Sequence, residues 1–368
     1  MAAPTEVYVD PSINANSGSG TIGSPYGDLQ YALNTKTRDA TNGDRFNIKA
    51  GTAEVLTAAL SLATYGSPSF GSPLIIQGYT SAANDGGIGE ISGAGTYAIY
   101  SGNASSIILR DMRLGNCGAA DVVTLNGGSQ CSIVNVEFQN SSGNGLRVLG
   151  SRHAVYGCHF HDLGNIGCEI AGDDQVVFAC YCKNDGIHSF TSAIKLLDVS
   201  NGMAFGNIVS VSGSSNGILC QFANHVVNNS VMSSGGTGTG ILINNDSARV
   251  LNNIVDGFSG SGGIGIRLDS GQKHHLLGFN AVYNCATAYS LIGDVMVNLG
   301  DNETLSDTPF AKSGADSYAN KFTYFAPVDT GNVLTGYQSG SNVAKGAVQN
   351  AGGSASRPQH PMFQQVIG

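Results

Sequence analysis

Short apolar runs recur along this chain about every 22–27 residues, from roughly Ser105 to Asp294. Within each repeat, an apolar run leads into a turn rich in Gly, Asn and Ser, and a second apolar run follows. Apolar and polar residues alternate in these runs as they do in β-strands, and the repeat contains no helix-length pattern. Because a fixed period of this size is typical of solenoids, the pattern predicts a parallel β-helix in which each repeat forms one coil.

The opening runs of the repeats align on two inward columns that lie two residues apart. The first column consists of Leu114, Phe138, Phe160, Cys182, Val209, Val231 and Val255. The second consists of Met112, Val136, Cys158, Cys180, Asn207, Asn229 and Asn253. The two columns keep the same spacing through loops of unequal length. We therefore expect the members of a column to lie directly above one another, one strand spacing apart.

Asn207, Asn229 and Asn253 replace apolar residues in the second inward column. A buried amide without a hydrogen-bond partner is costly. Stacked asparagines avoid that cost, because they can bond one another and the turn backbone between coils. We interpret these three residues as a structural ladder and not as a ligand site.

The chain changes character on both sides of the repeat. A short strand at 7–9, an N-cap and proline at Ser24-Pro25, and the apolar stripe of Leu29, Ala32 and Leu33 predict a capping helix near the N-terminus. Such a cap protects the open strand edge of a solenoid. We divide the chain into an N-terminal cap with the first strands (1–60), the coils (61–294), an irregular, aromatic-rich C-terminal cap (295–349), and a tail that is flexible or ordered by a partner (350–368).

Charge and composition argue against two kinds of partner. The 368 residues carry a net charge of −9, only 12% are charged, and no Lys/Arg cluster occurs, so nucleic acid is not expected to bind. No stretch approaches the ~20 apolar residues that span a membrane. The first residues, Met-Ala-Ala-Pro-Thr-Glu, contain neither a basic segment nor an apolar run, so we expect no secretory signal and synthesis in a cytoplasm.

The chain has eight cysteines, and several of them lie on inward columns. We interpret them as small buried residues with free thiols. A disulfide between Cys158 and Cys180, on adjacent coils, is the alternative. Metal binding by Cys180 and Cys182 is disfavoured, because a second pair of thiols is missing.

Several segments resemble a known family. They are Val7-Tyr8-Val9-Asp10-Pro11, Gly23-Ser24-Pro25-Tyr26-Gly27-Asp28-Leu29-Gln30-Tyr31-Ala32-Leu33, Gly43-Asp44, Ala50-Gly51-Thr52 and, near the C-terminus, Lys345-Gly346-Ala347-Val348-Gln349. Together they resemble the right-handed parallel β-helix family related to pectate lyases, and most of all the versions carried by phages. The resemblance implies an all-β, right-handed solenoid. It leaves the activity open, because this superfamily includes lyases, hydrolases, epimerases, phage tailspikes and adhesins.

Polar residues form two outward columns on the opening strands. One column contains Glu137, His159 and Tyr181, and the other contains Gln139, His161 and Lys183. By resemblance, lyases of this fold use a Lys, Arg or His base, often with Ca²⁺ held by carboxylates. The catalytic candidates are therefore His159, His161, Tyr181 and Lys183. The binding candidates are Glu137, Gln139, Asp162, Asp185 and His188, and Asp173 and Asp174 are weak calcium candidates.

The same residue types also occur on any solvated strand face, and two family patterns are missing. We find no paired-Asp motif followed by Gly-His-Gly, and no cluster of three carboxylates with a nearby Arg. We therefore favour a non-enzymatic structural or adhesive protein without a cofactor. The resemblance implies a phage spike, fibre or capsid-decorating protein, located in the virion or, before assembly, in the host cytoplasm.

Outward aliphatic residues such as Ile208, Leu219, Leu242 and Ile254 indicate a covered face. They favour a homo-oligomer, a trimer by analogy with viral β-helices, or a larger virion assembly that contacts a surface or a glycan. The alternative function is a polysaccharide lyase or glycoside hydrolase that acts on an acidic polysaccharide, with Ca²⁺ if it is a lyase.

Overall fold

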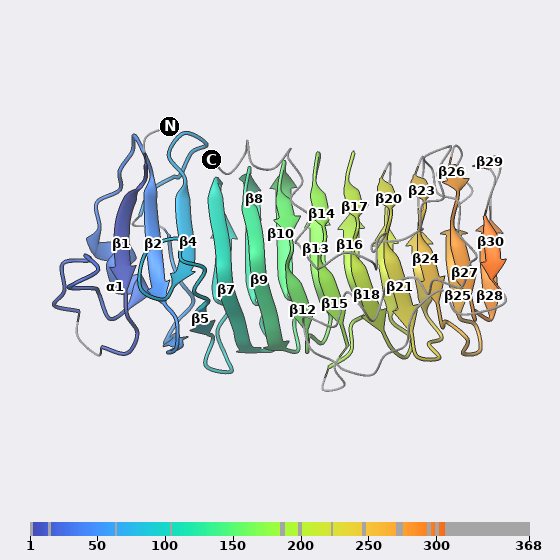
Figure 1. Cartoon of the computed structure of the whole chain (residues 1–368), viewed down its shortest axis with the longest axis horizontal. Coiled ribbons are helices and arrows are strands. Elements are labelled where there is room, and N and C mark those ends of the chain that lie inside the picture. Colours follow the sequence, from blue (N-terminus) through green and yellow to red (C-terminus); the bar gives the residue numbers. More distant parts are fainter. Residues whose placement is uncertain are drawn as a thin grey trace.

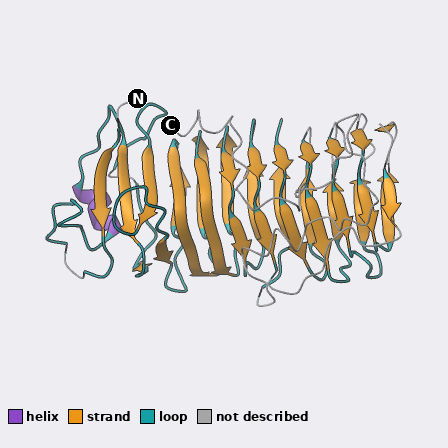
Figure 2. Cartoon of the chain, in the orientation of Figure 1, coloured by secondary structure: helices purple, strands orange, loops and turns teal. Residues whose placement is uncertain are grey.

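The computed structural model is an elongated rod built almost entirely from strands (Figures 1 and 2). It describes residues 3–13, 16–62, 65–103, 105–184, 188–197, 201–221, 224–244, 248–269, 275–292, 296–298 and 302–305. All pairings between its named strands are parallel, as in the β-helix that the repeat predicts. The C-terminal tail and most of the predicted C-terminal cap lie outside the described residues.

Three rows of strands run along the rod. The first row is β1 (Thr5–Val9), β2 (Asp44–Lys49), β4 (Leu74–Tyr79), β7 (Ile107–Gly118), β9 (Ser132–Ser141), β11 (Ala154–Tyr156), β14 (Val176–Phe178), β17 (Met203–Phe205), β20 (His225–Val227), β23 (Arg249–Leu251), β26 (His275–Gly278) and β29 (Met296–Asn298). The second row is β3 (Glu54–Val55), β5 (Gly89–Ser92), the distal parts of β7 and β9, β12 (His159–His161), β15 (Tyr181–Lys183), β18 (Ile208–Val211), β21 (Ser230–Ser233), β24 (Ile254–Asp256), β27 (Ala281–Tyr283) and β30 (Glu303–Leu305).

The third row forms a separate nine-stranded sheet. It contains β6 (Tyr100–Asn103), β8 (Val123–Ser129), β10 (Leu146–Ser151), β13 (Ile166–Ala171), β16 (Ser192–Leu197), β19 (Asn216–Cys220), β22 (Thr239–Ile243), β25 (Ile264–Asp269) and β28 (Thr287–Ile292). The stacking passes the expected boundary at 294, because β29 pairs with β26 and β30 pairs with β27.

The interior is filled by stacked side chains in the predicted register. Phe138 pairs with Phe160, Phe160 with Cys182, and Cys182 with Val209. The rings of Phe138 and Phe160 are parallel within 5°, and their centroids lie 4.9 Å apart. All eight cysteines are free thiols and seven are buried, so the alternative of a disulfide between Cys158 and Cys180 is wrong. Burial raises the pKa of the Cys158 and Cys182 thiols.

The asparagine column forms a continuous ladder of hydrogen bonds. The Oδ1 atom of Asn229 accepts bonds from the backbone N and the Nδ2 of Asn207, at 2.9 and 3.0 Å. Asn253 accepts the same pair of bonds from Asn229. The ladder continues through Asn280 and Asn302, which were not among the three asparagines predicted from the sequence.

The backbone conformation at the corner between the first and second rows explains the position of the asparagine ladder. A residue with positive φ occupies this corner in successive coils: Asp111, Asn135, Gly157, Ala179, Gly206, Asn228, Asn252 and Phe279. Gly, Asn and Asp adopt this left-handed conformation at low cost. Each of the ladder residues Asn207, Asn229, Asn253 and Asn280 directly follows such a residue, so its side chain turns inward, where its Nδ2 donates to a backbone carbonyl of the preceding coil.

The N-terminal end is closed by a helix. Helix α1 (Leu29–Thr35) buries Leu29, Ala32 and Leu33, as predicted, but its N-cap is Asp28, whose carboxylate accepts from the backbone of Tyr31. The expected N-cap at Ser24 is therefore wrong, because the helix begins later. Among the described residues, no helix is both long and apolar enough to cross a membrane.

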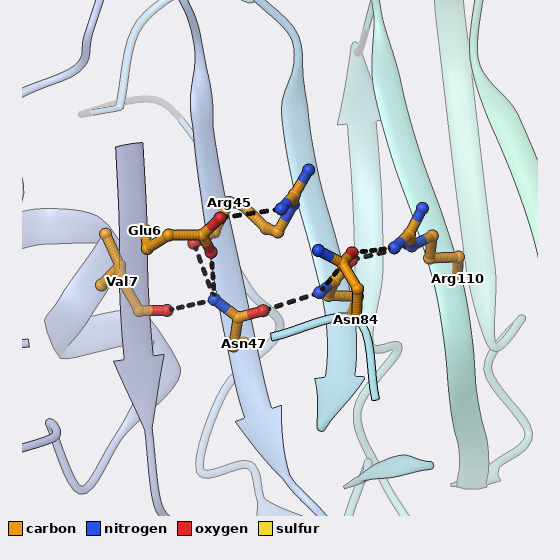
Figure 3. A network of polar contacts seen from close by, with 7 residues as sticks. Glu6, Val7, Arg45, Asn47, Asn84 and Arg110 are labelled. Atoms are coloured by element: carbon orange, nitrogen blue, oxygen red, sulfur yellow. Dashed lines mark hydrogen bonds and ion pairs between the residues drawn. The ribbon is translucent and has the colours of Figure 1, made fainter. Parts of the chain in front are cut away.

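A polar network covers the outer face of the first coils (Figure 3). Asn47 is fully buried and donates to the carboxylate of Glu6 at 2.8 Å and to the carbonyl of Val7 at 3.2 Å. Gln77 donates to Asn47, and Arg110 donates to Gln77, both at 2.7 Å. Arg110 also contacts Asn84, so a loop is tied to β2, β4 and β7. These bonds satisfy polar groups that would otherwise be buried without partners.

Glu54 gives the N-terminal end a predicted pH dependence. Its carboxylate is buried and accepts from the backbone N of Leu29 at 3.3 Å. Burial, aided by the negative charge of Asp28, raises its pKa from 4.5 to about 7. Since the folded state holds the proton more tightly, the contribution of Glu54 to stability is most favourable below pH 4.5 and falls as the pH rises toward 7.

We expect Glu54→Gln to raise the free energy of unfolding at pH 8 by about 1–3 kcal/mol and to change it little at pH 4. Urea unfolding at both pH values, followed by circular dichroism, measures this difference. The control is Glu90→Gln at a half-exposed position, which should keep the wild-type pH dependence. An equal gain at pH 4 and pH 8 would contradict the assignment to Glu54 ionisation.

Candidate functional site

A column of polar side chains crosses five neighbouring strands of the second row. The residues of this polar column are Glu90 on β5, Arg113 on β7, Glu137 on β9, His159 on β12 and Tyr181 on β15. Each is in register with the next. Their neighbours in sequence, such as Phe138 and Phe160, point inward, so the alternation of the strands turns the polar column outward. Adjacent members are therefore separated by one strand spacing, about 4.8 Å.

Glu137, His159 and His161 form the centre of the site. Oε1 of Glu137 lies 2.9 Å from Nε2 of His161 and 3.8 Å from Nδ1 of His159. The two imidazole rings stack with centroids 4.4 Å apart, and the ring of Tyr181 lies 5.1 Å from that of His159. The histidines are largely buried, whereas 27% of the Glu137 side chain is exposed. The cluster is thus a compact set of donors and acceptors that solvent reaches through Glu137.

Arg113 holds the other side of the Glu137 carboxylate. Its Nε donates to Oε2 of Glu137 at 2.9 Å, and its Nη1 lies 3.6 Å from Glu90. The hydrogen bond from His161, together with Arg113, lowers the pKa of Glu137 to about 2 despite partial burial. Glu137 in turn raises the pKa of Arg113. Both groups are therefore charged at every physiological pH.

Asp162 contacts the second nitrogen of His161. Its Oδ2 lies 3.3 Å from Nδ1 of His161, and its buried Oδ1 has no hydrogen-bond partner among the described residues. Asp162 has a φ of 51°, a left-handed conformation that aspartate tolerates well. This turn directs the carboxylate back toward the histidine that precedes it. His161 consequently lies between two carboxylates.

The other predicted residues are spread around this centre. Lys183 pairs in register with His161 on the neighbouring strand and is half-buried. Gln139 lies on β9, in register with Gly115. Asp185 lies outside the described residues. His188 is half-buried and, within the described part of the chain, makes no hydrogen bond or ion pair with the cluster.

The two calcium candidates lie in a different turn. Asp173 and Asp174 are exposed, and the carboxylate of Asp174 accepts from Asn201 at 3.3 Å. Within the described ranges they belong to no group of three metal-ligating side chains. They therefore form no built cation site with described residues.

Two members of the polar column, Glu90 and Arg113, were not among the predicted residues. With Glu137 and Asp162 they bring three carboxylates together near an arginine, so the expectation that the chain lacks such a group is wrong. The repeat spacing could have identified Arg113 as an outward residue of the column, because it lies 24 residues before Glu137 and directly precedes the inward residue Leu114. Glu90 was harder to find, since the loop before β7 breaks the repeat at this end of the rod.

A cavity of about 630 Å³ lies apart from the polar column. Its lining includes Leu60, Pro68, Tyr100, Asn103 and Ile107. None of the predicted site residues lines this cavity, and the hydroxyl of Tyr100 donates to the carbonyl of Asn103. With Tyr100 as its titratable side chain, the cavity offers no pair of acid and base groups.

Comparison with known proteins shows the fold. No family model and no curated protein matches the sequence. Among solved structures, a pectate lyase, Pel9A, aligns with a TM-score of 0.68 and 14% identity over 95% of this chain and 97% of its own. A rhamnogalacturonan lyase is also similar, with a TM-score of 0.46 and 13% identity over 83% of this chain and 90% of its own. ORF18 of Geobacillus virus E2 aligns with a TM-score of 0.45 and 12% identity over 80% of this chain and 60% of its own. The chain therefore has the pectate-lyase-like, right-handed parallel β-helix fold.

Proposed function

We propose that this protein is a rigid, non-enzymatic structural or adhesive protein that contacts an acidic glycan through the polar column. The observation that carries this proposal is the accessible part of the column on three consecutive coils. Side-chain exposure is 39% for Glu90, 43% for Arg113 and 27% for Glu137. Since hydrogen-bonded strands hold these groups, little conformational entropy is lost when a ligand binds.

Arg113 is the group best suited to an acidic sugar. A guanidinium offers a planar fork of donors that matches a carboxylate. Its bond to Glu137 is short, but its contact with Glu90 at 3.6 Å is longer than a hydrogen bond. A glycan carboxylate can therefore replace Glu90 while Glu137 keeps the guanidinium in place.

The ion pairs of the cluster support a role without catalysis. A general base must accept a proton near the working pH. Glu137, with a pKa of about 2, is a poor base. Both ring nitrogens of His161 face carboxylates, an arrangement in which the imidazole donates on both sides.

We extend the proposal to a homo-oligomeric virion surface component. The resemblance of the N-terminal segments to phage versions of the fold supports the location. Leu219 and Leu242 point outward on the third row and are partly buried, which supports a contact between copies. Ile208 and Ile254 do not contribute to such a contact between copies, because they are only 2% and 0% exposed within the chain.

Binding to polygalacturonate, with amylose as the neutral comparison, tests the function by titration calorimetry. We expect the wild type to bind polygalacturonate and not amylose. Arg113→Ala should bind polygalacturonate at least tenfold more weakly, since this variant loses a charge-assisted contact. Arg249→Ala is the matched control, because Arg249 is exposed on another part of the rod. Equal affinity of wild type and Arg113→Ala would refute the proposal. Native mass spectrometry of the same sample reports the oligomeric state.

A second candidate function is a polysaccharide lyase with Lys183 as the base. Lys183 favours it, because this residue lies beside His161 on the neighbouring strand. Ultraviolet absorbance of unsaturated product, measured with Ca²⁺ present, distinguishes the two functions. Turnover that Lys183→Ala abolishes and Lys195→Ala retains would establish the lyase and exclude the non-enzymatic role.

A further inference from the structure

The three residues at the centre of the site have the composition of a metal centre. One oxygen of Glu137 and one ring nitrogen each of His159 and His161 all lie within 4.8 Å of one another. We propose that these three side chains bind a divalent transition metal ion of the zinc class. This inference goes beyond glycan contact and does not depend on it.

The donor set selects the kind of metal. Two imidazole nitrogens and one carboxylate oxygen suit Zn²⁺, Fe²⁺, Co²⁺ or Ni²⁺, whereas Ca²⁺ and Mg²⁺ prefer oxygen ligands alone. Metal–ligand bonds of about 2.0–2.2 Å in a tetrahedral arrangement place ligand atoms roughly 3.3 Å apart. The distances of 2.9 and 3.8 Å from Glu137 to the two histidines fall on either side of that value. Because a metal ion lies in the plane of each imidazole ring that binds it, the two rings, stacked at an interplanar angle of 22°, must turn toward a common point to form the site.

The backbone prepares the three ligands. His159 and His161 are two residues apart on β12, so they point to the same face of the strand. Glu137 stands in register with His159 on the adjacent strand β9. Since strands of a stacked solenoid cannot slide independently, the ligands are held together without an ion.

The residues around the ligands have the arrangement that tunes metal sites. A metal-bound histidine usually donates its other ring N–H to a carboxylate, and a ligating carboxylate is itself hydrogen-bonded. Nδ1 of His161 faces Asp162 at 3.3 Å, which leaves Nε2 for the metal. Oε2 of Glu137 is held by Arg113 at 2.9 Å, which leaves Oε1 for the metal. Two of the three ligands thus already have their supporting partner.

Local charge also favours a cation, and a bound cation would offset the excess of carboxylates that opposes an acidic glycan. Glu90, Glu137 and Asp162 carry three negative charges, against the positive charges of Arg113 and Lys183. Glu137 is the most exposed ligand and provides the route from solvent, while the histidines on the other side are largely shielded. The ion would replace the proton shared between His161 and Glu137.

The test uses the full chain without a histidine tag, stripped of metal and titrated with Co²⁺ and then Zn²⁺. We expect one ion per chain, with visible Co²⁺ bands that Zn²⁺ removes. His159→Ala and Glu137→Gln should each weaken binding at least tenfold, and Asp162→Asn should weaken it about 10–100-fold, as loss of a supporting carboxylate does. His225→Ala is the control, because it removes a half-buried histidine elsewhere on the rod.

Circular dichroism of each variant verifies folding. If His159→Ala fails to fold, Asp162→Asn and Glu137→Gln decide the matter, since both are nearly isosteric. Absence of binding by the wild type, or equal binding by the wild type and Glu137→Gln, would overturn the proposal. Because no glycan is present, this result is independent of the glycan titration.

Discussion

Asn229→Leu is expected to lower the free energy of unfolding by about 3–5 kcal/mol, because several buried groups lose their partners at about 1–3 kcal/mol each. Asn229 accepts two bonds from Asn207 and donates to the carbonyls of Ala204 and Val227 and to Asn253. Leucine has a similar volume but neither gives nor accepts a hydrogen bond. Calorimetric melting and chemical unfolding measure the loss.

The position of the change within the ladder provides a second readout. Each coil of a solenoid contacts only its neighbours, so the damage should be local at first. Hydrogen exchange should accelerate at the corners of Asn207 and Asn253 before it does so near Phe138. Asn229→Asp should be at least as harmful, because it places a carboxylate against the Oδ1 of Asn253.

The control for this change is Asn165→Leu. Asn165 is exposed and accepts one side-chain bond from Thr191, so we expect an effect within about 1 kcal/mol. Wild-type stability of Asn229→Leu would mean that the ladder contributes nothing to the fold. Equal losses at Asn229 and Asn165 would show that the effect is unrelated to burial.

The interior of the rod was predictable from sequence because stacking constrains it. Phe138, Phe160 and Cys182 occupy equivalent positions, and a displaced strand would expose all of its apolar residues at once. The same logic identified Asn207, Asn229 and Asn253. Asn280 and Asn302 continue the spacing, but they lie where the apolar pattern weakens near the C-terminal end of the repeat.

The outer face was less predictable because packing does not fix its residue types. The register of Glu137, His159 and Tyr181 follows from the spacing alone. Their contacts do not, since these depend on side-chain rotamers and on the backbone turn at Asp162. The salt bridge from Arg113 was missed for this reason, as was the close approach of the three metal-ligating atoms.

Phe160→Ala is the second change for which we expect a large effect, with a loss of about 3–5 kcal/mol in the free energy of unfolding. The side chain is fully buried and stacked on Phe138. The cavity cannot close easily, because the strands on both sides are held in register by backbone hydrogen bonds. Glycines pack against the ring: a Cβ atom at Gly145 would lie 3.1 Å from Cδ1 of Phe160.

A double-mutant cycle with Phe138→Ala isolates the stacking between the two rings. We expect a coupling free energy of about 0.5–1.5 kcal/mol beyond the loss of buried area. Tyr156→Ala is the control: Tyr156 stacks on Phe178 at a centroid distance of 5.2 Å but lies on the outer, partly exposed face. Its loss should cost about 1 kcal/mol, since solvent fills the space. If Phe160→Ala cost no more than Tyr156→Ala, the two phenylalanines could not form part of a continuous interior stack.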